Sequence, residues 1–157
     1  MRSQLLMIAC FLVVACRQET GIDGYWLSDQ QRNSKEALAR PNLPPQYVAR
    51  VESGELYGHL LYFFQDGMAA SSYWGTCSPL SEIQLRPSVE GVSEVVFLGV
   101  GKSNELGIET GFFFDGRELW AQTSGLVNQP EYFKRISEKD ALREAPCMQD
   151  LKNADTR

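Results

Sequence analysis

The chain has little of what most enzymes use for chemistry. Among its 157 residues there is one histidine, His59, so a zinc site would have to rely mainly on carboxylates, and any hydrolytic triad would have to recruit that single residue. The sequence contains no G-x-S-x-G nucleophile elbow. Basic residues are outnumbered, 15 against 20 acidic ones, and the net charge of −5 argues against a nucleic-acid partner. We therefore expect neither enzymatic activity nor a metal or other cofactor.

The sequence also has no long apolar run, and its N-terminal apolar run is short. Arg2 precedes residues 5–15, which are uncharged, mostly apolar and free of Gly and Pro, and a membrane-spanning helix needs about 20 apolar residues. A charged start, a short apolar stretch and a small residue before the cut are typical of a secretory signal peptide. The alternative is an N-terminal core helix that buries both of its thiols.

The end of this run, Val13-Val14-Ala15-Cys16, resembles a bacterial lipobox. The resemblance implies cleavage before Cys16 and acylation of that cysteine, with palmitate among the expected fatty acids. Cys10 is a poorer candidate because its apolar stretch is too short. We expect a lipoprotein of the cell envelope, held in the membrane by its lipid and facing the periplasm. Arg17, where some lipoproteins have aspartate, resembles outer-membrane sorting.

These signals predict three segments: a signal peptide over 1–15, a lipidated tether over 16–21 and one β-rich domain over 22–157. Cleavage leaves 142 residues and a net charge near −6, since the removed piece contains Arg2 and no acid. In an oxidising compartment the two remaining cysteines, Cys77 and Cys147, are expected to form a disulfide bond. The alternative is two buried free thiols.

Most of the domain reads as short strands separated by turn residues. The expected strands are 24–28, 59–64, 68–74, 82–86, 94–99, 106–114, 118–123 and 132–136. Asp66-Gly67 and Asp115-Gly116 are the turn dipeptides that hairpins prefer. Many short strands with such turns favour a barrel or sandwich over a βαβ fold.

Helical signals occur in only two places. Residues 30–54 contain a helix-favouring stretch at 36–40, an interruption at Pro41–Pro45 and a further helical turn around Tyr47 to Val51. Ser137, followed by Glu138 and Asp140, predicts the capped start of a short helix to about Leu142. The fold class expected is mainly β: a single antiparallel β-barrel or sandwich of about eight strands, with a short helical insertion and a C-terminal helix.

Two other patterns suggest chemistry but fit it poorly. Gly99-Val100-Gly101-Lys102-Ser103 resembles the end of a phosphate loop, but Val96 stands where the pattern needs glycine. Carboxylate pairs could be composed from Glu105, Glu109, Asp115 and Glu118. These acids flank predicted turns, where water should keep them ionised, so we interpret them as a solvated rim.

Aromatic residues are the more informative set, because nearly all of them fall on predicted strands. The run Phe112-Phe113-Phe114 places aromatics on both faces of one strand, so either helices cover the second face or an apolar surface is available for binding. Our candidate binding residues are Tyr73, Trp74, Phe112 and Trp120.

Gly24-Tyr25-Trp26 on the first strand, with Arg135 on the last, resembles the pattern of lipocalin-like barrels. In that family an arginine from the last strand lies across the first-strand tryptophan. The helical insertion at 30–54 departs from the family, which usually has a plain loop there. A β-sandwich is the alternative.

The general plan also resembles that of small envelope inhibitors, such as lysozyme inhibitors and periplasmic immunity proteins that neutralise toxins or lipases. Two hypotheses follow. In the first, the domain binds and neutralises a protein partner, a secreted toxin or hydrolase, with Trp74 or Trp120 as anchors. In the second it carries a small apolar ligand inside the barrel, with Trp26, Tyr62 and Phe113 enclosing the cavity.

Overall fold

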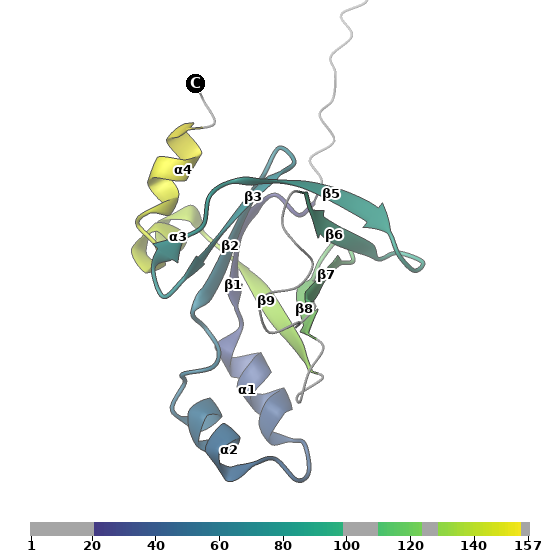
Figure 1. Cartoon of the computed structure of the whole chain (residues 1–157), viewed down its shortest axis with the longest axis vertical. Coiled ribbons are helices and arrows are strands. Elements are labelled where there is room, and N and C mark those ends of the chain that lie inside the picture. The colour runs from purple at the N-terminus through teal and green to yellow at the C-terminus, as the bar shows by residue number, and fades with distance from the viewer. Residues whose placement is uncertain (1–20, 99–109, 124–128, 155–157) are drawn as a thin grey trace, which may run out of the picture.

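The computed structural model describes residues 21–98, 110–123 and 129–154, which form nine strands and four short helices (Figure 1). The strands are β1 (Gly24–Ser28), β2 (Leu60–Gln65), β3 (Met68–Tyr73), β4 (Thr76–Cys77), β5 (Ser81–Pro87), β6 (Ser93–Phe97), β7 (Thr110–Phe114), β8 (Leu119–Thr123) and β9 (Pro130–Ile136). The helices are α1 (Gln30–Leu38), α2 (Pro45–Glu52), α3 (Glu138–Glu144) and α4 (Met148–Ala154).

Eight strands close into an antiparallel up-and-down barrel. Each pairs with the next along the chain, β4 excepted, and the ring is completed by β1 pairing with both β2 and β9. β4 lies outside the ring, hydrogen-bonded to the end of β3. The prediction of a mainly β fold with about eight strands is confirmed, and of the two alternatives the barrel is the one found.

The two Asp-Gly turns differ from each other. Asp66 and Gly67, with φ of 52° and 81°, form the expected two-residue loop between β2 and β3. The second loop has four residues, 115–118, in which the Asp115 carboxylate accepts hydrogen bonds from the backbone N–H groups of Arg117 (2.9 Å) and Glu118 (2.7 Å). These bonds from the chain lower the pKa of Asp115. Its carboxylate therefore stabilises a turn.

Alternate residues of each strand fill the barrel with apolar side chains, as the pleat requires. The buried members are Ile22, Trp26, Tyr62, Phe64, Ala69, Ile83, Val95, Phe114, Leu119, Ala121 and Phe133. The Trp26 indole donates to the carbonyl of Ile22 (2.7 Å), and the Arg135 guanidinium lies 4.8 Å from the centre of the Trp26 ring. Arg135 also donates to the Gly21 carbonyl. The two residues on which the lipocalin-like resemblance rests are thus in contact.

The helical insertion between β1 and β2 is attached to the barrel through α1. Asn33, fully buried, donates to the carbonyl of Tyr132 (2.9 Å) and accepts from its N–H (2.8 Å), so one side chain pairs with the backbone of β9 as a neighbouring strand would. Arg32 lies over the ring of Tyr132 at 3.5 Å and pairs with Glu118. The predicted helix at 36–40 begins earlier than expected, at Gln30, because Asp29 caps it by accepting from the Arg32 N–H.

The C-terminal helices α3 and α4 cover the outer face of β1, β2 and β3, on the left in Figure 1. Ser137 caps α3 as predicted, accepting from the Asp140 N–H, whereas α4 was not foreseen. The buried residues of this outer core are Tyr25, Leu61, Phe63, Ala70, Ala141, Ala145 and Met148. Cys77 of β4 and Cys147, just before α4, form the predicted disulfide bond, with Cα atoms 6.0 Å apart. None of the helices in the described part of the chain combines the length and apolar character needed to cross a membrane.

Candidate functional site: a pocket beside Trp74

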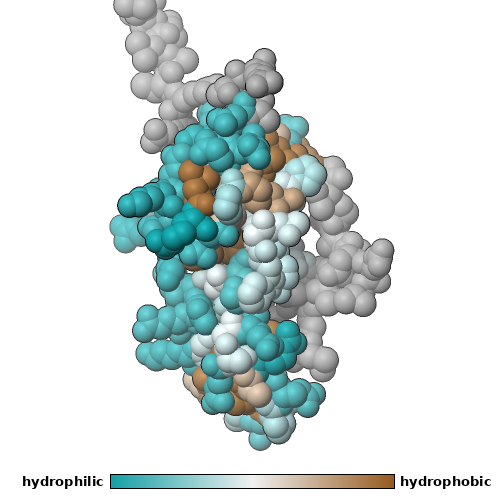
Figure 2. Space-filling view, turned by 90° about the vertical axis from the view of Figure 1, so that its left-hand side faces the viewer, coloured by the Kyte–Doolittle hydropathy of each residue, from teal (hydrophilic) through white to brown (hydrophobic). Residues whose placement is uncertain are grey.

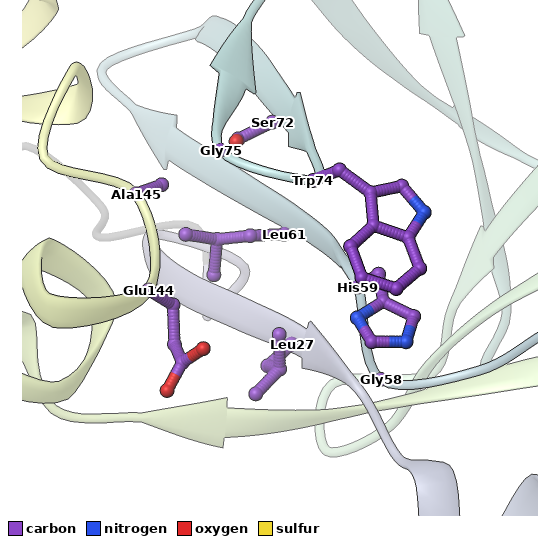
Figure 3. Close-up of a pocket in the computed structure, with 9 residues that line it drawn as sticks. All are labelled: Leu27, Gly58, His59, Leu61, Ser72, Trp74, Gly75, Glu144 and Ala145. Atoms are coloured by element: carbon purple, nitrogen blue, oxygen red, sulfur yellow. The ribbon is translucent and has the colours of Figure 1, made fainter. Parts of the chain in front are cut away.

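A pocket of about 240 Å³ opens on the outer face of the barrel, between three strands and the end of α3 (Figure 3). Its floor is one row of the sheet: Leu27 of β1 is paired with Leu61 of β2, which is paired with Ser72 of β3. Because residues in one row point to the same face, these three side chains lie side by side. The floor is therefore apolar at one end and carries a hydroxyl at the other.

One wall of the pocket is an aromatic stack. The rings of His59 and Trp74 lie 3.5 Å apart at their centroids, with their planes 15° from parallel. His59 Nε2 is 2.8 Å from the Gly54 carbonyl, which can only accept, so this nitrogen carries the proton of the bond. The lone histidine is thus a packed and hydrogen-bonded side chain that supports the tryptophan.

Trp74 occupies a costly backbone position. It forms a two-residue turn with Gly75 between Tyr73 and Thr76, and both turn residues have positive φ, 51° and 76°. A turn of this kind prefers Asn-Gly or Asp-Gly, and a bulky residue there is a true outlier that costs about 1–3 kcal/mol. The indole is also 58% exposed, and its neighbour Tyr73 is 55% exposed. Strain and exposed apolar area at one residue point to a role outside the fold.

The opposite wall is the last turn of α3, formed by Glu144 and Ala145. The disulfide holds this wall in place, since Cys77 is paired with Ser72 in the sheet and Cys147 follows Ala145 by two residues. The Cys147 sulfur lies 3.3 Å from the carbonyl oxygen of Gly75. The covalent bond therefore fixes the distance between the turn that carries Trp74 and the helix that faces it.

Two polar side chains at the pocket, Ser72 and Glu144, differ in burial and in hydrogen bonding. The Ser72 side chain is 1% exposed and its hydroxyl has no hydrogen-bond partner within the described ranges. Glu144 is about half exposed and lies 3.6 Å from the Nε of Arg143, which also pairs with Asp140 at 3.2 Å. A buried hydroxyl without a partner costs about 1–3 kcal/mol, which a ligand that bonds to it would recover.

The sequence-predicted binding residues do not form one surface. Trp74 lines the pocket, and the ring of Tyr73 lies 6.3 Å from the Trp74 ring but outside the pocket lining. The structure ends β3 at Tyr73, so the predicted strand 68–74 is one residue too long. Trp120 faces outward from β8, stacked on Phe113 at 5.8 Å, and β8 lies four strands from β3 in either direction around the ring. Phe112 points into the barrel, and Phe113, expected to help enclose a cavity there, points away from it.

An acidic side chain, Glu131, faces the barrel interior. Glu131 follows the inward alternation of β9 with Phe133, and it accepts a hydrogen bond of 2.5 Å from the hydroxyl of Ser28. Burial raises the pKa of Glu131, and the Ser28 bond opposes that shift. Tyr62 is nearby, and its pKa is also raised, first by burial and then by the charge of Glu131.

Sequence reasoning missed most of the pocket. Ser72, Leu27 and Glu144 carry no local signal, because long-range pairing alone brings them together. One signal was available: Trp74-Gly75 between Tyr73 and Thr76 is a two-residue turn ending in glycine. Cys16, the glycine-rich segment 99–103, Glu105 and Glu109 lie outside the described residues. Among the residues that are described, no cluster of three or more His, Cys, Asp or Glu side chains could hold a metal ion.

Searches of protein-family models, curated proteins and solved structures found no match for this chain.

Proposed function

We propose that this protein is an envelope lipoprotein, anchored through Cys16, that binds and neutralises a protein partner such as a secreted toxin or hydrolase. The observation that supports binding is Trp74, exposed at the rim of a pocket and held in a strained turn. Tryptophan is one of the residues that most often dominate binding energy in interfaces. Strain kept at such a residue is expected where a surface serves recognition.

The surroundings of the turn also favour docking. Figure 2 shows the face with the C-terminal helices: its upper part is mostly hydrophilic with apolar spots between, and a paler band of intermediate hydropathy separates it from the α1–α2 end. The disulfide-tied wall needs little reordering when a partner binds, and low reordering cost favours tight binding. The acidic net charge of −5 favours a basic partner by steering.

Site-specific photocrosslinking tests this proposal. Tyr73 is replaced by the photoreactive residue p-benzoylphenylalanine, the tagged protein is expressed in its own cell, and crosslinked products are identified by mass spectrometry. The same replacement at Val89, an exposed apolar residue on the β5–β6 loop, is the matched control. One protein captured from Tyr73 and not from Val89 supports the proposal. Equal capture from both positions, or none, contradicts it.

Substitutions then separate the two candidate anchors. Trp74→Ala should reduce capture at least tenfold, because loss of an interface anchor costs about 2 kcal/mol or more. Trp120→Ala removes the same side chain from the opposite side of the barrel, and should leave capture unchanged. A loss with Trp120→Ala alone would move the interface to β8 and refute the assignment to Trp74.

A second candidate, a carrier of a small apolar ligand, is favoured by one observation. Four side chains that pack against the inner core are only partly buried: Leu60, Leu85, Phe97 and Phe112. Phe112 is 5.1 Å from Tyr62 and 5.3 Å from Phe97, so these rings form a joined apolar surface. Organic extraction of protein purified from its own cell, followed by mass spectrometry, tests this candidate: a stoichiometric small molecule that Phe112→Ala displaces supports it, and a clean extract contradicts it.

A further inference from the structure

The pocket is sized for one side chain. Its volume of about 240 Å³ lies below the range of roughly 300–1,000 Å³ that is usual for sites of drug-sized ligands. Its wall includes the exposed Trp74, on the surface proposed to meet the partner. A side chain that projects from the partner next to Trp74 would therefore enter this pocket.

The polar groups of the pocket are suited to a hydrogen-bond donor. The Glu144 carboxylate accepts only, and the Ser72 hydroxyl, buried and without a partner, can accept through its oxygen. Glu144 lies on the wall formed by α3, and Ser72 lies on the floor formed by the sheet. A single cationic point cannot serve two separated acceptors as well as a branched donor can.

The apolar groups of the pocket are suited to an aliphatic stem. Leu27 and Leu61 line the floor and Ala145 the far wall, and long basic side chains bury their methylene groups along such surfaces while the charged end bonds elsewhere. The Trp74 and His59 rings form the remaining wall, and a guanidinium packs well against aromatic rings. The only basic side chain paired with Glu144 in the described part of the chain is Arg143, at 3.6 Å and largely exposed.

We propose that this pocket accepts an arginine side chain of the protein partner. The stem of the arginine lies over Leu27 and Leu61, and its guanidinium donates to the Ser72 hydroxyl and to the Glu144 carboxylate. This inference rests on the proposed function and names the group that the same surface recognises. It also explains why a hydroxyl is kept unpaired at a buried position where alanine would fit.

A titration of isotope-labelled full-length protein with N-acetyl-arginine amide tests the inference by NMR. The amide signals of Ser72, Gly75 and Ala145 should shift and saturate in the millimolar range. N-acetyl-citrulline amide has nearly the same shape without the charge, and it should bind at least threefold more weakly. N-acetyl-lysine amide should also bind more weakly, because it offers one point of donation. Equal binding of citrulline, equal or tighter binding of lysine, or shifts that do not saturate, would overturn the proposal.

Variants locate the contacts. Glu144→Gln should weaken arginine binding about two- to fivefold, as expected for an exposed ion pair, whereas Arg143→Gln removes a competitor and should leave it equal or tighter. Ser72→Ala should weaken binding while the melting temperature is held or raised, since the unpaired hydroxyl is removed. Weaker binding with Arg143→Gln, or unchanged binding with Ser72→Ala, would refute the assignment.

The two proposals can fail separately. If Tyr73 crosslinks one partner but N-acetyl-arginine amide does not bind, the protein-binding function stands and the arginine pocket does not. If the arginine derivative binds but no partner is captured, the pocket stands and the proposed function fails.

Discussion

The indole of Trp74 lies flat on the imidazole of His59, with ring centroids 3.5 Å apart. This stack joins the residue before β2 to the residue after β3, so it extends the β2–β3 pairing by one step beyond Leu60 and Tyr73. The backbone N–H of Trp74 also donates to the backbone carbonyl of His59 at 3.2 Å, so the two backbones are hydrogen-bonded as well. The tryptophan is therefore held firmly although it is exposed.

Replacing Trp74 by asparagine should separate stability from binding. Asparagine tolerates positive φ and suits the turn, so about 1–3 kcal/mol of strain is relieved, while the lost stacking costs about 0.5–1.5 kcal/mol. We expect the free energy of unfolding to be held or raised, and partner capture to be lost. Trp74→Ala loses the stack without suiting the turn and should be less stable than Trp74→Asn. Urea unfolding of both variants checks this, and a loss above about 2 kcal/mol with asparagine would contradict it.

Asn33→Ala should destabilise the protein by about 1–3 kcal/mol. The substitution leaves the N–H of Tyr132 without the acceptor that Asn33 provides, whereas the Tyr132 carbonyl still accepts from the Asp29 N–H at 2.8 Å. Ser34→Ala, in the next position of α1, is the control and should change stability by about 0.5 kcal/mol or less. Equal losses for the two variants in chemical denaturation would rule out this role for Asn33.

Glu131→Gln should stabilise the protein in a pH-dependent way. Burial raises the pKa of Glu131 in the folded state, so the folded protein holds that proton more tightly than the unfolded chain does. The contribution of the protonated group is present in full below the unfolded pKa of about 4.3, and it is lost as pH rises through the higher folded value. Glutamine keeps an acceptor for Ser28 without the charge. Its advantage over wild type should be larger near pH 7.5 than near pH 4.5 in urea unfolding, and an equal advantage at both would contradict the assignment.

Removing the disulfide should lower stability by about 4 kcal/mol. Cys77 and Cys147 are 70 residues apart, and in the chain-entropy model a loop of that length gives this magnitude. The double substitution to serine is compared with wild type in denaturant, with and without a reducing agent. Reduced wild type should approach the double variant, and the variant should lose arginine binding because its two pocket walls are no longer tied. A reducing agent without effect on wild type would contradict the prediction.

Cys16→Ser should release the protein from the membrane fraction, because it removes the thiol that we propose carries the lipid. Cys10→Ser is the matched control and should leave fractionation unchanged. Fractionation of cells that express each tagged variant, followed by immunoblotting, measures this. Retention of Cys16→Ser in membranes would refute lipidation at that position.

The strands could be predicted from the sequence because their signals are local. Asp66-Gly67 marks a hairpin, alternating residues mark 82–86, and Ser137 marks the start of α3. These strand and turn features depend on neighbours in the chain, which a sequence displays directly. The Cys77–Cys147 bond was predicted on another ground, the cysteine count and the expected compartment.

The pocket could not be predicted, because it depends on register. Leu27, Leu61 and Ser72 form one row only when β1, β2 and β3 pair as they do, and a shift by one residue would turn Ser72 inward. Phe113 illustrates the same point: three adjacent phenylalanines do not reveal that Phe113 is the one that faces away from the core. Trp74 could have been identified, because its turn position can be recognised from the sequence. The opposite wall of the pocket, at Ala145, could not be predicted in this way.

The pairing of β1 with β9 sets the order in which the molecule can fold. Trp26 reaches its final packing only after Arg135, more than a hundred residues later, has joined it, so no N-terminal portion of the barrel completes its core early. Such distant contacts are associated with slow folding. A chain that ends before Pro130 lacks β9, and it should accumulate as an open sheet with unpaired edges at β1 and β8 that remains sensitive to proteases and prone to aggregation.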